Sequence, residues 1–259
     1  MDLREIPGES FTRHPWEGAR ARFFTGLVAD RRLGGGQTPL QVLDVGAGDG
    51  YLAGQLLGRL PAGSAVTCFD PFYTDAHLAR PAQPGLTFTR QRPDRRFDLV
   101  LLLDVVEHVP DDRAFLGEIV NNALAKGGAA LISVPAWMSL YCQHDQALGH
   151  HRRYRPAELG ALVSAVGLTA VAQGGLFHSL LAPRTATKLG ELARGIRSRP
   201  DPAGPAVFAD TELGRWRAGK AVTAAVNAAL RVDNGLSRLA AKVGLPLPGL
   251  SVWTLGIKS

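Results

Sequence analysis

The sequence predicts an α/β fold in which a doubly wound, mostly parallel sheet of seven strands carries helices on both faces. Short apolar runs alternate with amphipathic stretches over residues 41–173, an order typical of parallel strands joined by crossover helices. The run 97–104 is rich in Leu and Val, as expected of a central strand that is covered on both faces. A third observation is the loop 46–50, Gly-Ala-Gly-Asp-Gly, which joins a strand directly to a helix.

The individual elements follow from periodicity and from the residues that end them. We expect strands at 41–46, 65–70, 86–89, 97–104, 129–134, 168–173 and 251–258. We expect helices at 15–33, 51–60, 74–80 and 156–166. One more helix should start at Asp111-Asp112, whose charges suit a helix amino end, and close at Gly127-Gly128.

The chain between the sixth and last strands is too long for a simple connection. It holds two amphipathic stretches, 180–196 and 211–232, separated by a segment rich in Pro and Gly. An unstructured loop of that length is uncommon, so we expect a helical insertion that serves as a lid or an interface. The expected organisation is a helical cap at 1–40, a core at 41–175, the insertion at 176–248 and the last strand at 249–259.

Composition indicates one globular unit. With 259 residues, 46% of them hydrophobic, the chain can bury a large core. The amino end has no signal-peptide pattern and no apolar run approaches the ~20 residues of a membrane span, so we expect a cytoplasmic location. Cys68 and Cys142 are expected to be reduced, packed thiols.

The net charge of +6 comes entirely from the end of the chain. Residues 1–179 hold 17 Lys and Arg against 18 acids, whereas residues 180–259 hold 12 against 5. The sequence shows no nucleic-acid-binding module, so we expect no nucleic-acid partner. A weak contact of the basic segment with a membrane surface stays open beside a simply solvated helix face, and we expect a monomer or a homodimer.

The glycine loop predicts a nucleotide-like cofactor. Gly46, Gly48 and Gly50 allow close approach of the backbone to a ligand at the start of a helix. Their spacing departs from the dinucleotide fingerprint, and Asp44 precedes them, which favours a ligand with a cationic amine and disfavours a nicotinamide-dependent reductase. Asp70, at the end of the second strand, is placed to accept hydrogen bonds from both hydroxyls of a ribose.

With Phe97–Asp104 and the following Glu107-His108-Val109, this pattern resembles class I S-adenosylmethionine-dependent methyltransferases over residues 40–175. The resemblance implies a Rossmann-like sheet and S-adenosyl-L-methionine as cofactor. This sequence has no clear counterpart for the acid that often meets the adenine amine, so Gln91 or Asp94 would serve there, or the backbone would make the contact. The implied cofactor-binding residues are Asp44, Gly46, Ala47, Gly48, Gly50, Asp70, Pro71, Gln91, Asp104, Val105, His108 and Trp16.

A second dense motif follows the fifth strand. The segment 141–154 is rich in His, Arg and Tyr; with His14-Pro-Trp-Glu17 it resembles a bacterial group of small-molecule methyltransferases that carry HPWE and HD…GHHRRY motifs. A structural hydrogen-bond network is an equal alternative to a direct role with substrate. A metal site is the rival reading, with ligand types at His144, Asp145, His150 and His151, but we expect no metal because ligands on one loop need a further partner.

The expected reaction is methyl transfer to a small organic molecule, with O-methylation slightly ahead of N- or C-methylation. Imidazole can act as a base near neutral pH, and the candidate catalytic residues are His144, His108, His151 and Tyr154. For His108 a place beside the cofactor is the first interpretation. Asp104-Val-Val-Glu107 replaces the Asp/Asn-Pro-Pro-Tyr motif of enzymes that methylate nucleic-acid bases. The alternative from another class is a non-catalytic S-adenosylmethionine-binding module that uses the insertion for assembly.

Overall fold

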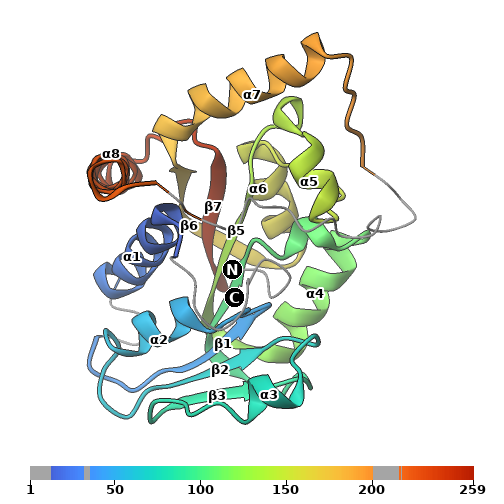
Figure 1. Cartoon of the computed structure of the whole chain (residues 1–259). Helices are drawn as coiled ribbons and strands as arrows, with labels where there is room; N and C mark the ends of the chain where they lie inside the picture. The colour runs from blue at the N-terminus through green and yellow to red at the C-terminus, as the bar shows by residue number, and fades with distance from the viewer. Residues whose placement is uncertain (1–12, 32–35, 201–215, 217) are drawn as a thin grey trace.

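The computed structural model describes residues 13–31, 36–200, 216 and 218–259. Its centre is a seven-stranded sheet with the order β3-β2-β1-β4-β5-β7-β6, parallel except for β7, which runs antiparallel to both its neighbours (Figure 1). The predicted doubly wound, Rossmann-like fold is therefore confirmed. The strands are β1 Gln41–Val45, β2 Ala65–Phe69, β3 Leu86–Thr89, β4 Phe97–Leu103, β5 Leu124–Pro135, β6 Leu168–Leu176 and β7 Ser251–Lys258.

Helices cover both faces of the sheet (Figure 1). The α-helices are α1 Pro15–Asp30, α2 Tyr51–Leu57, α3 Asp75–Leu78, α4 Asp112–Ala123, α5 Gln143–Ala147, α6 Pro156–Ala165, α7 Leu181–Ala193 and α8 Lys220–Lys242. The described residues also form short 3-10 helices, η3 Val106–His108, η4 Met138–Leu140 and η5 His178–Leu180.

Alternation along the central strands builds two separate cores. Val42, Leu99 and Leu101 pack with apolar residues of α1, α2 and α8, whereas Leu43 and Val100 pack with those of α4 and α6. Successive side chains on a strand point to opposite faces, which is why these two sets interleave in the sequence. The layers leave the carboxyl ends of β1, β2, β4 and β5 at one edge of the sheet, where ligands bind in folds of this kind.

The boundary between α4 and β5 was predicted wrongly. The helix ends at Ala123, before Gly127-Gly128, and β5 begins at Leu124 instead of residue 129. Leu124 pairs with Phe97, and the register then shifts so that Ala129 pairs with Leu99. The apolar Leu124 thus serves the sheet, and the left-handed φ of +74° at Gly127 belongs to an irregularity inside the strand.

The last long helix was also misplaced. We expected it at 211–232; residues 211–215 and 217 lie outside the described residues, and α8 continues to Lys242. Asp233 and Asn234 are residue types that often end a helix, but here both are buried and form hydrogen bonds. Asp233 accepts hydrogen bonds from the backbone and side chain of Ser179, and Asn234 donates one to the carbonyl of Ala19 in α1. Tertiary contacts therefore extend the helix beyond its local signals.

Other differences are small. Helices α1, α2, α3, α6 and α7 end one to three residues before their expected limits, and β6 runs on to Leu176. Residues 32–35 lie outside the described residues. Helix α5 lies in a segment expected to be a loop. Cys68 and Cys142 are buried free thiols, as predicted.

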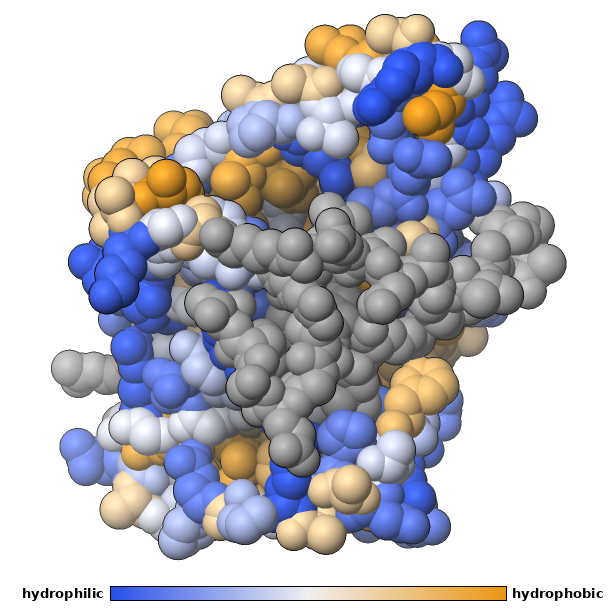
Figure 2. All heavy atoms as spheres, in the orientation of Figure 1, coloured by the Kyte–Doolittle hydropathy of each residue, from blue (hydrophilic) through white to orange (hydrophobic). Residues whose placement is uncertain are grey.

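Helices α7 and α8 expose part of their apolar face. Figure 2 shows apolar surface over both helices, and the exposed residues there include Leu189, Leu192, Val232, Leu236 and Leu239. No helix among the described residues is long and apolar enough to cross a membrane. The weak contact with a membrane surface stays a prediction, and so does the oligomeric state. The division of the chain into a cap, a core, an insertion and a last strand also stays a prediction.

Candidate active site

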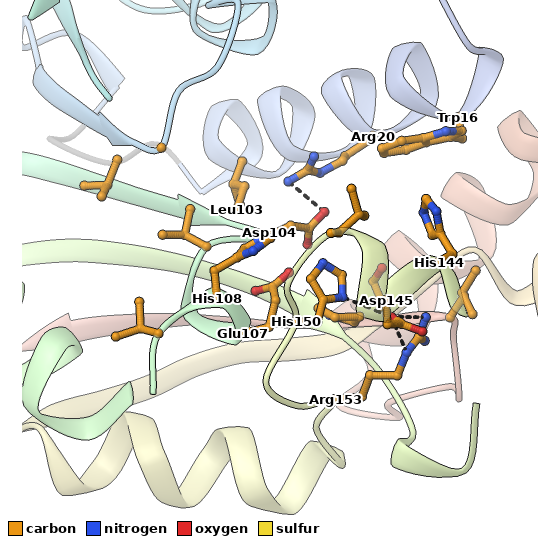
Figure 3. Close-up of a pocket in the computed structure, with 18 of the residues that line it drawn as sticks. Trp16, Arg20, Leu103, Asp104, Glu107, His108, His144, Asp145, His150 and Arg153 are labelled. Carbon is orange, nitrogen blue, oxygen red and sulfur yellow. Dashed lines mark hydrogen bonds and ion pairs between the residues drawn. The ribbon is translucent and has the colours of Figure 1, made fainter. Parts of the chain in front are cut away.

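A cavity of about 570 Å³ opens at the carboxyl edge of the sheet (Figure 3). Its lining comes from the ends of β1, β2, β4 and β5, from α1, from η3 and from the segment around α5. Phe177, Leu180 and Arg184, at the start of the predicted insertion, complete the wall. The cavity therefore joins the glycine loop, the dense histidine segment and the insertion in one space.

The glycine loop has the conformation that its sequence predicts. Gly46, Gly48 and Gly50 have φ values of +65°, +55° and +74°, a region that disfavours residues with a Cβ. A Cβ at Gly46 would lie 2.7 Å from Cγ2 of Val105, and one at Gly50 would lie 2.7 Å from the ring of Phe88. At Gly46 and Gly50, glycine is therefore required both by backbone conformation and by space, and at Gly48 it is favoured by backbone conformation.

Asp70 lies beside this loop, as predicted. Its Oδ2 accepts a hydrogen bond from the backbone of Gly48 at 3.3 Å and its Oδ1 one from the backbone of Phe72 at 3.0 Å. The carboxylate is thus oriented by the loop, is buried and lines the cavity together with the exposed Pro71. Two oriented oxygens with further lone pairs are suited to a ribose diol.

Asp44 lies at the end of β1, buried beneath the glycine loop. Burial raises the pKa of Asp44 to about 7, and the nearby Asp70 acts in the same direction, while Arg20 lowers it. A cationic ligand in the adjacent cavity would favour the ionised form. This carboxyl group therefore fits a cofactor that carries positive charge.

Helix α1 forms one side of the cavity. Trp16 and Arg20 line it, and Arg20 forms an ion pair with Asp104 at 3.0 Å (Figure 3). Asp104 has a left-handed φ of +58°, uncommon for a residue with a side chain, where the chain turns out of β4. At the start of α1, His14 and Glu17 form a reciprocal cap, which fixes the HPWE motif as a helix start.

The other predicted cofactor residues divide into two groups. Val105 and His108 line the cavity with Gly46, Asp70, Pro71, Asp104 and Trp16. Asp44, Ala47, Gly48 and Gly50 shape or support the loop without lining the cavity. Gln91 is exposed after β3 and does not line it either, so the structure gives Gln91 no contact that would favour an adenine role.

Asp145 is the centre of the histidine segment. Its fully buried carboxylate accepts hydrogen bonds from His150 Nδ1 at 3.0 Å, Arg153 Nε at 2.8 Å and Arg184 Nη2 at 2.9 Å. Burial by itself would raise the pKa of Asp145, but the hydrogen bond from His150 and the charge of Arg153 outweigh it and hold the pKa below its usual range. The structural network proposed as an alternative for this segment is therefore present.

Three side chains bring chemistry to the cavity, two from η3 and one from α5. His144 lines the cavity, and burial together with Arg184 lowers its pKa to about 4, so its imidazole is neutral near pH 7. Its Nδ1 is buried and has no hydrogen-bond partner among the described residues. Glu107 and His108 line the same wall, and burial and the charge of Asp104 raise the pKa of Glu107 well above its ordinary value.

His151 and Tyr154 do not line the cavity. The backbone of His151 donates a hydrogen bond to the carbonyl of Glu107 at 2.8 Å, and Tyr154 is buried in the core with its hydroxyl bonded to Asp112 at 2.8 Å. These hydrogen bonds position the segment. As candidate catalytic residues, His151 and Tyr154 are not supported by this geometry.

The sequence interpretation missed part of the site. Glu107, His150, Arg153 and Arg184 all line the cavity, yet none was expected to have a catalytic or cofactor role. The motif Gly149–Tyr154 contained two of them, but the pattern does not reveal which histidine faces the ligand. Arg184 lies on α7, 39 residues from its partner Asp145, and carried no local signal.

Fold and site together define the class of protein. A Rossmann-like sheet with an antiparallel last strand, a glycine loop with no room for a Cβ at Gly46 or Gly50, and an oriented carboxylate at the next strand fit S-adenosylmethionine. Residues 16–173 match the family model described as a methyltransferase domain. The chain therefore belongs to the methyltransferase domain family, and S-adenosylmethionine is its cofactor.

The chain matches curated relatives over only part of its own length and of theirs. A ubiquinone biosynthesis O-methyltransferase from Paramagnetospirillum magneticum is 32% identical over 164 residues, which are 55% of this chain and 65% of that protein. An uncharacterized methyltransferase from Mycobacterium sp. (strain JLS) is 31% identical over 123 residues, 45% of this chain and 46% of that protein. The chain thus spans about half to two thirds of the length of these relatives.

Among solved structures, the [4+2]-cyclase SpnF is 17% identical and matches with a TM-score of 0.52 over 98% of this chain and 84% of its own. A provisionally assigned sarcosine dimethylglycine methyltransferase from Galdieria sulphuraria is 15% identical and also has a TM-score of 0.52, over 94% of this chain and 86% of its own. These likenesses show the fold alone.

Proposed function

We propose that the protein transfers the methyl group of S-adenosylmethionine to an oxygen atom of a small organic molecule. The observation that carries this proposal is the single cavity that holds both the cofactor loop at Gly46 and a wall with Glu107, His108 and His144. The similarity to a ubiquinone biosynthesis O-methyltransferase supports oxygen over nitrogen or carbon as the acceptor atom. The volume of about 570 Å³ is that of an ordinary small-molecule site.

When bound, the cofactor supplies a methyl group on a sulfonium. Gly46 and Asp70 would hold it at the ends of β1 and β2, and Trp16 and Arg20 would cover it from α1. The protein's main contribution is to hold the acceptor in line with that methyl group, since positioning alone supplies several kcal/mol.

His144 is suited to hold the acceptor. A neutral imidazole with an unpaired Nδ1 can accept a hydrogen bond from an acceptor hydroxyl. A pKa of about 4 makes it a weak base in the ligand-free protein, so its first role is orientation. His108, next to Glu107 on η3, is the second candidate for contact with the acceptor or the cofactor.

The start of the insertion acts as a cover for the acceptor. Leu180 and Arg184 line the cavity, and Arg184 is tied to the histidine segment through Asp145. The backbone of Gln143 also donates to Glu191 on α7 at 3.3 Å, which gives the two segments a second link. Movement of α7 would therefore change the acceptor wall directly.

The test is transfer from S-adenosylmethionine labelled in the methyl group to a panel of phenols, catechols, carboxylic acids and amines. Product NMR would distinguish O-methyl from N-methyl and C-methyl groups. Transfer only to nitrogen or carbon would contradict the preference for oxygen. Cofactor binding by calorimetry with no transfer to any acceptor class would favour the non-catalytic binding module.

A further inference from the structure

Glu107, His108 and His150 form a compact group at the cavity wall. One ligand atom from each of the three lies within 4.8 Å of the other two, and the imidazole rings of His108 and His150 meet edge to face at 4.7 Å between centroids. Figure 3 shows them facing one another, although His150 comes from the segment after α5 and the other two from η3. All three line the cavity.

The carboxyl group of Glu107 is buried without a hydrogen-bond partner among the described residues. The residue is fully buried, and neither carboxylate oxygen has a hydrogen-bond partner among the described residues. Leaving a buried acidic group unsatisfied costs folding free energy, so such a group normally has a ligand or a counter-ion. The neighbouring arginines do not fill this role by ion pairing, because Arg20 pairs with Asp104, and Arg153 and Arg184 pair with Asp145.

His150 is oriented as metal-binding histidines usually are. Its Nδ1 is hydrogen bonded to the carboxylate of Asp145 at 3.0 Å, which leaves Nε2 as the nitrogen available to a ligand. A carboxylate behind the imidazole fixes the tautomer and ring orientation and raises the basicity of the coordinating nitrogen. Asp145 is itself fixed by Arg153 and Arg184, so the ring is held from behind by a rigid group.

We propose that Glu107, His108 and His150 bind one divalent transition-metal ion whose open coordination positions face the cavity. Three atoms within 4.8 Å of one another surround a point no more than about 2.8 Å from each, and side-chain shifts of less than about 1 Å reach the 2.0–2.2 Å of zinc ligands. Two imidazoles and one carboxylate suit Zn²⁺ and neighbouring first-row ions better than Mg²⁺ or Ca²⁺.

The site would select oxygen-donor ligands in the cavity. A metal with three protein ligands keeps open positions for water or a ligand, and it lowers the pKa of a bound hydroxyl. Molecules that present a hydroxyl or carboxylate oxygen to this wall would therefore bind more tightly in the metal-loaded protein. The metal site does not depend on methyl transfer, so each of the two proposals can fail without the other.

The experiment is titration of Zn²⁺ alone into the metal-free full chain by calorimetry, with visible spectroscopy of the Co²⁺-loaded protein as a second readout. One equivalent should bind, and Glu107→Gln, His108→Asn and His150→Asn should each weaken binding by about tenfold to a hundredfold or more. His151→Gln is the matched control, because it removes the imidazole next to His150 in sequence but outside the cavity, and it should bind as the parent does.

A further measurement separates loss of the site from loss of the fold. Without metal, Glu107→Gln should be at least as stable as the parent, because it removes a buried acid that has no partner. Zn²⁺ should raise the melting temperature of the parent but not that of this variant. The proposal is overturned if the parent binds no stoichiometric Zn²⁺, or if His151→Gln lowers the affinity as much as His150→Asn does.

Discussion

Replacing Asp145 by Asn should destabilise the protein strongly. The change keeps the shape of the side chain but removes the charge that compensates Arg153 and Arg184, both of which are mostly buried. Removing one partner of a buried ion pair costs about 3–5 kcal/mol, because it leaves a buried charge uncompensated. In a protein of this size, that corresponds to a fall in melting temperature of about 6–20 °C.

Urea unfolding followed by circular dichroism measures this difference. Asp75→Asn is the matched control: its carboxylate also pairs with an arginine, Arg90, but the side chain is 91% exposed, so the change should cost less than about 1 kcal/mol. Arg184→Met should cost less in the Asp145→Asn background than alone, because it then removes a stranded charge. Equal stability of Asp145→Asn and Asp75→Asn would refute the central role of this cluster.

Three further predictions concern binding and transfer. Asp70→Ala should weaken S-adenosylmethionine binding by about one to three orders of magnitude with the fold intact, and unchanged affinity by calorimetry would exclude the ribose role. His144→Phe should lower single-turnover methyl transfer sharply while cofactor affinity stays within a few fold, whereas Tyr154→Phe, whose hydroxyl only meets Asp112, should transfer at nearly the parental rate. Since the pKa of Asp44 is raised to about 7, its charge appears as pH rises through that value; cofactor affinity should increase from roughly pH 6 to 8, and Asp44→Asn should abolish that increase.

The sequence predicted the sheet well because its signals are local. Each core strand is a short apolar run, and the loop after β1 shows its glycines within five residues, so the strand centres and the cofactor edge follow directly. The errors arose where contacts between residues far apart in the sequence determine the secondary structure. Leu124 could belong to a helix or to a strand until it is seen beside Phe97, and Asp233 resembles a helix end until Ser179 is seen to bond it.

The two halves of the candidate site differ in the same way. Gly46 and Asp70 each follow a strand, and parallel strands bring their carboxyl ends to one edge, so their proximity is a consequence of the fold class. The fold class does not determine which histidine faces the acceptor. Asp145 is next to His144 in the sequence, yet its carboxylate orients His150, five residues further on.

The proposed acceptor side of the cavity, lined by Glu107, His108 and His144, therefore depends on an ion pair between α7 and the histidine segment. Arg184, on the insertion, meets Asp145, which orients His150, and His150 in turn lies against His108. A change in α7 can thus reach the wall through three contacts without altering Gly46 or Asp70. We therefore expect that variation in the insertion changes which small molecule is accepted while the use of S-adenosylmethionine is retained.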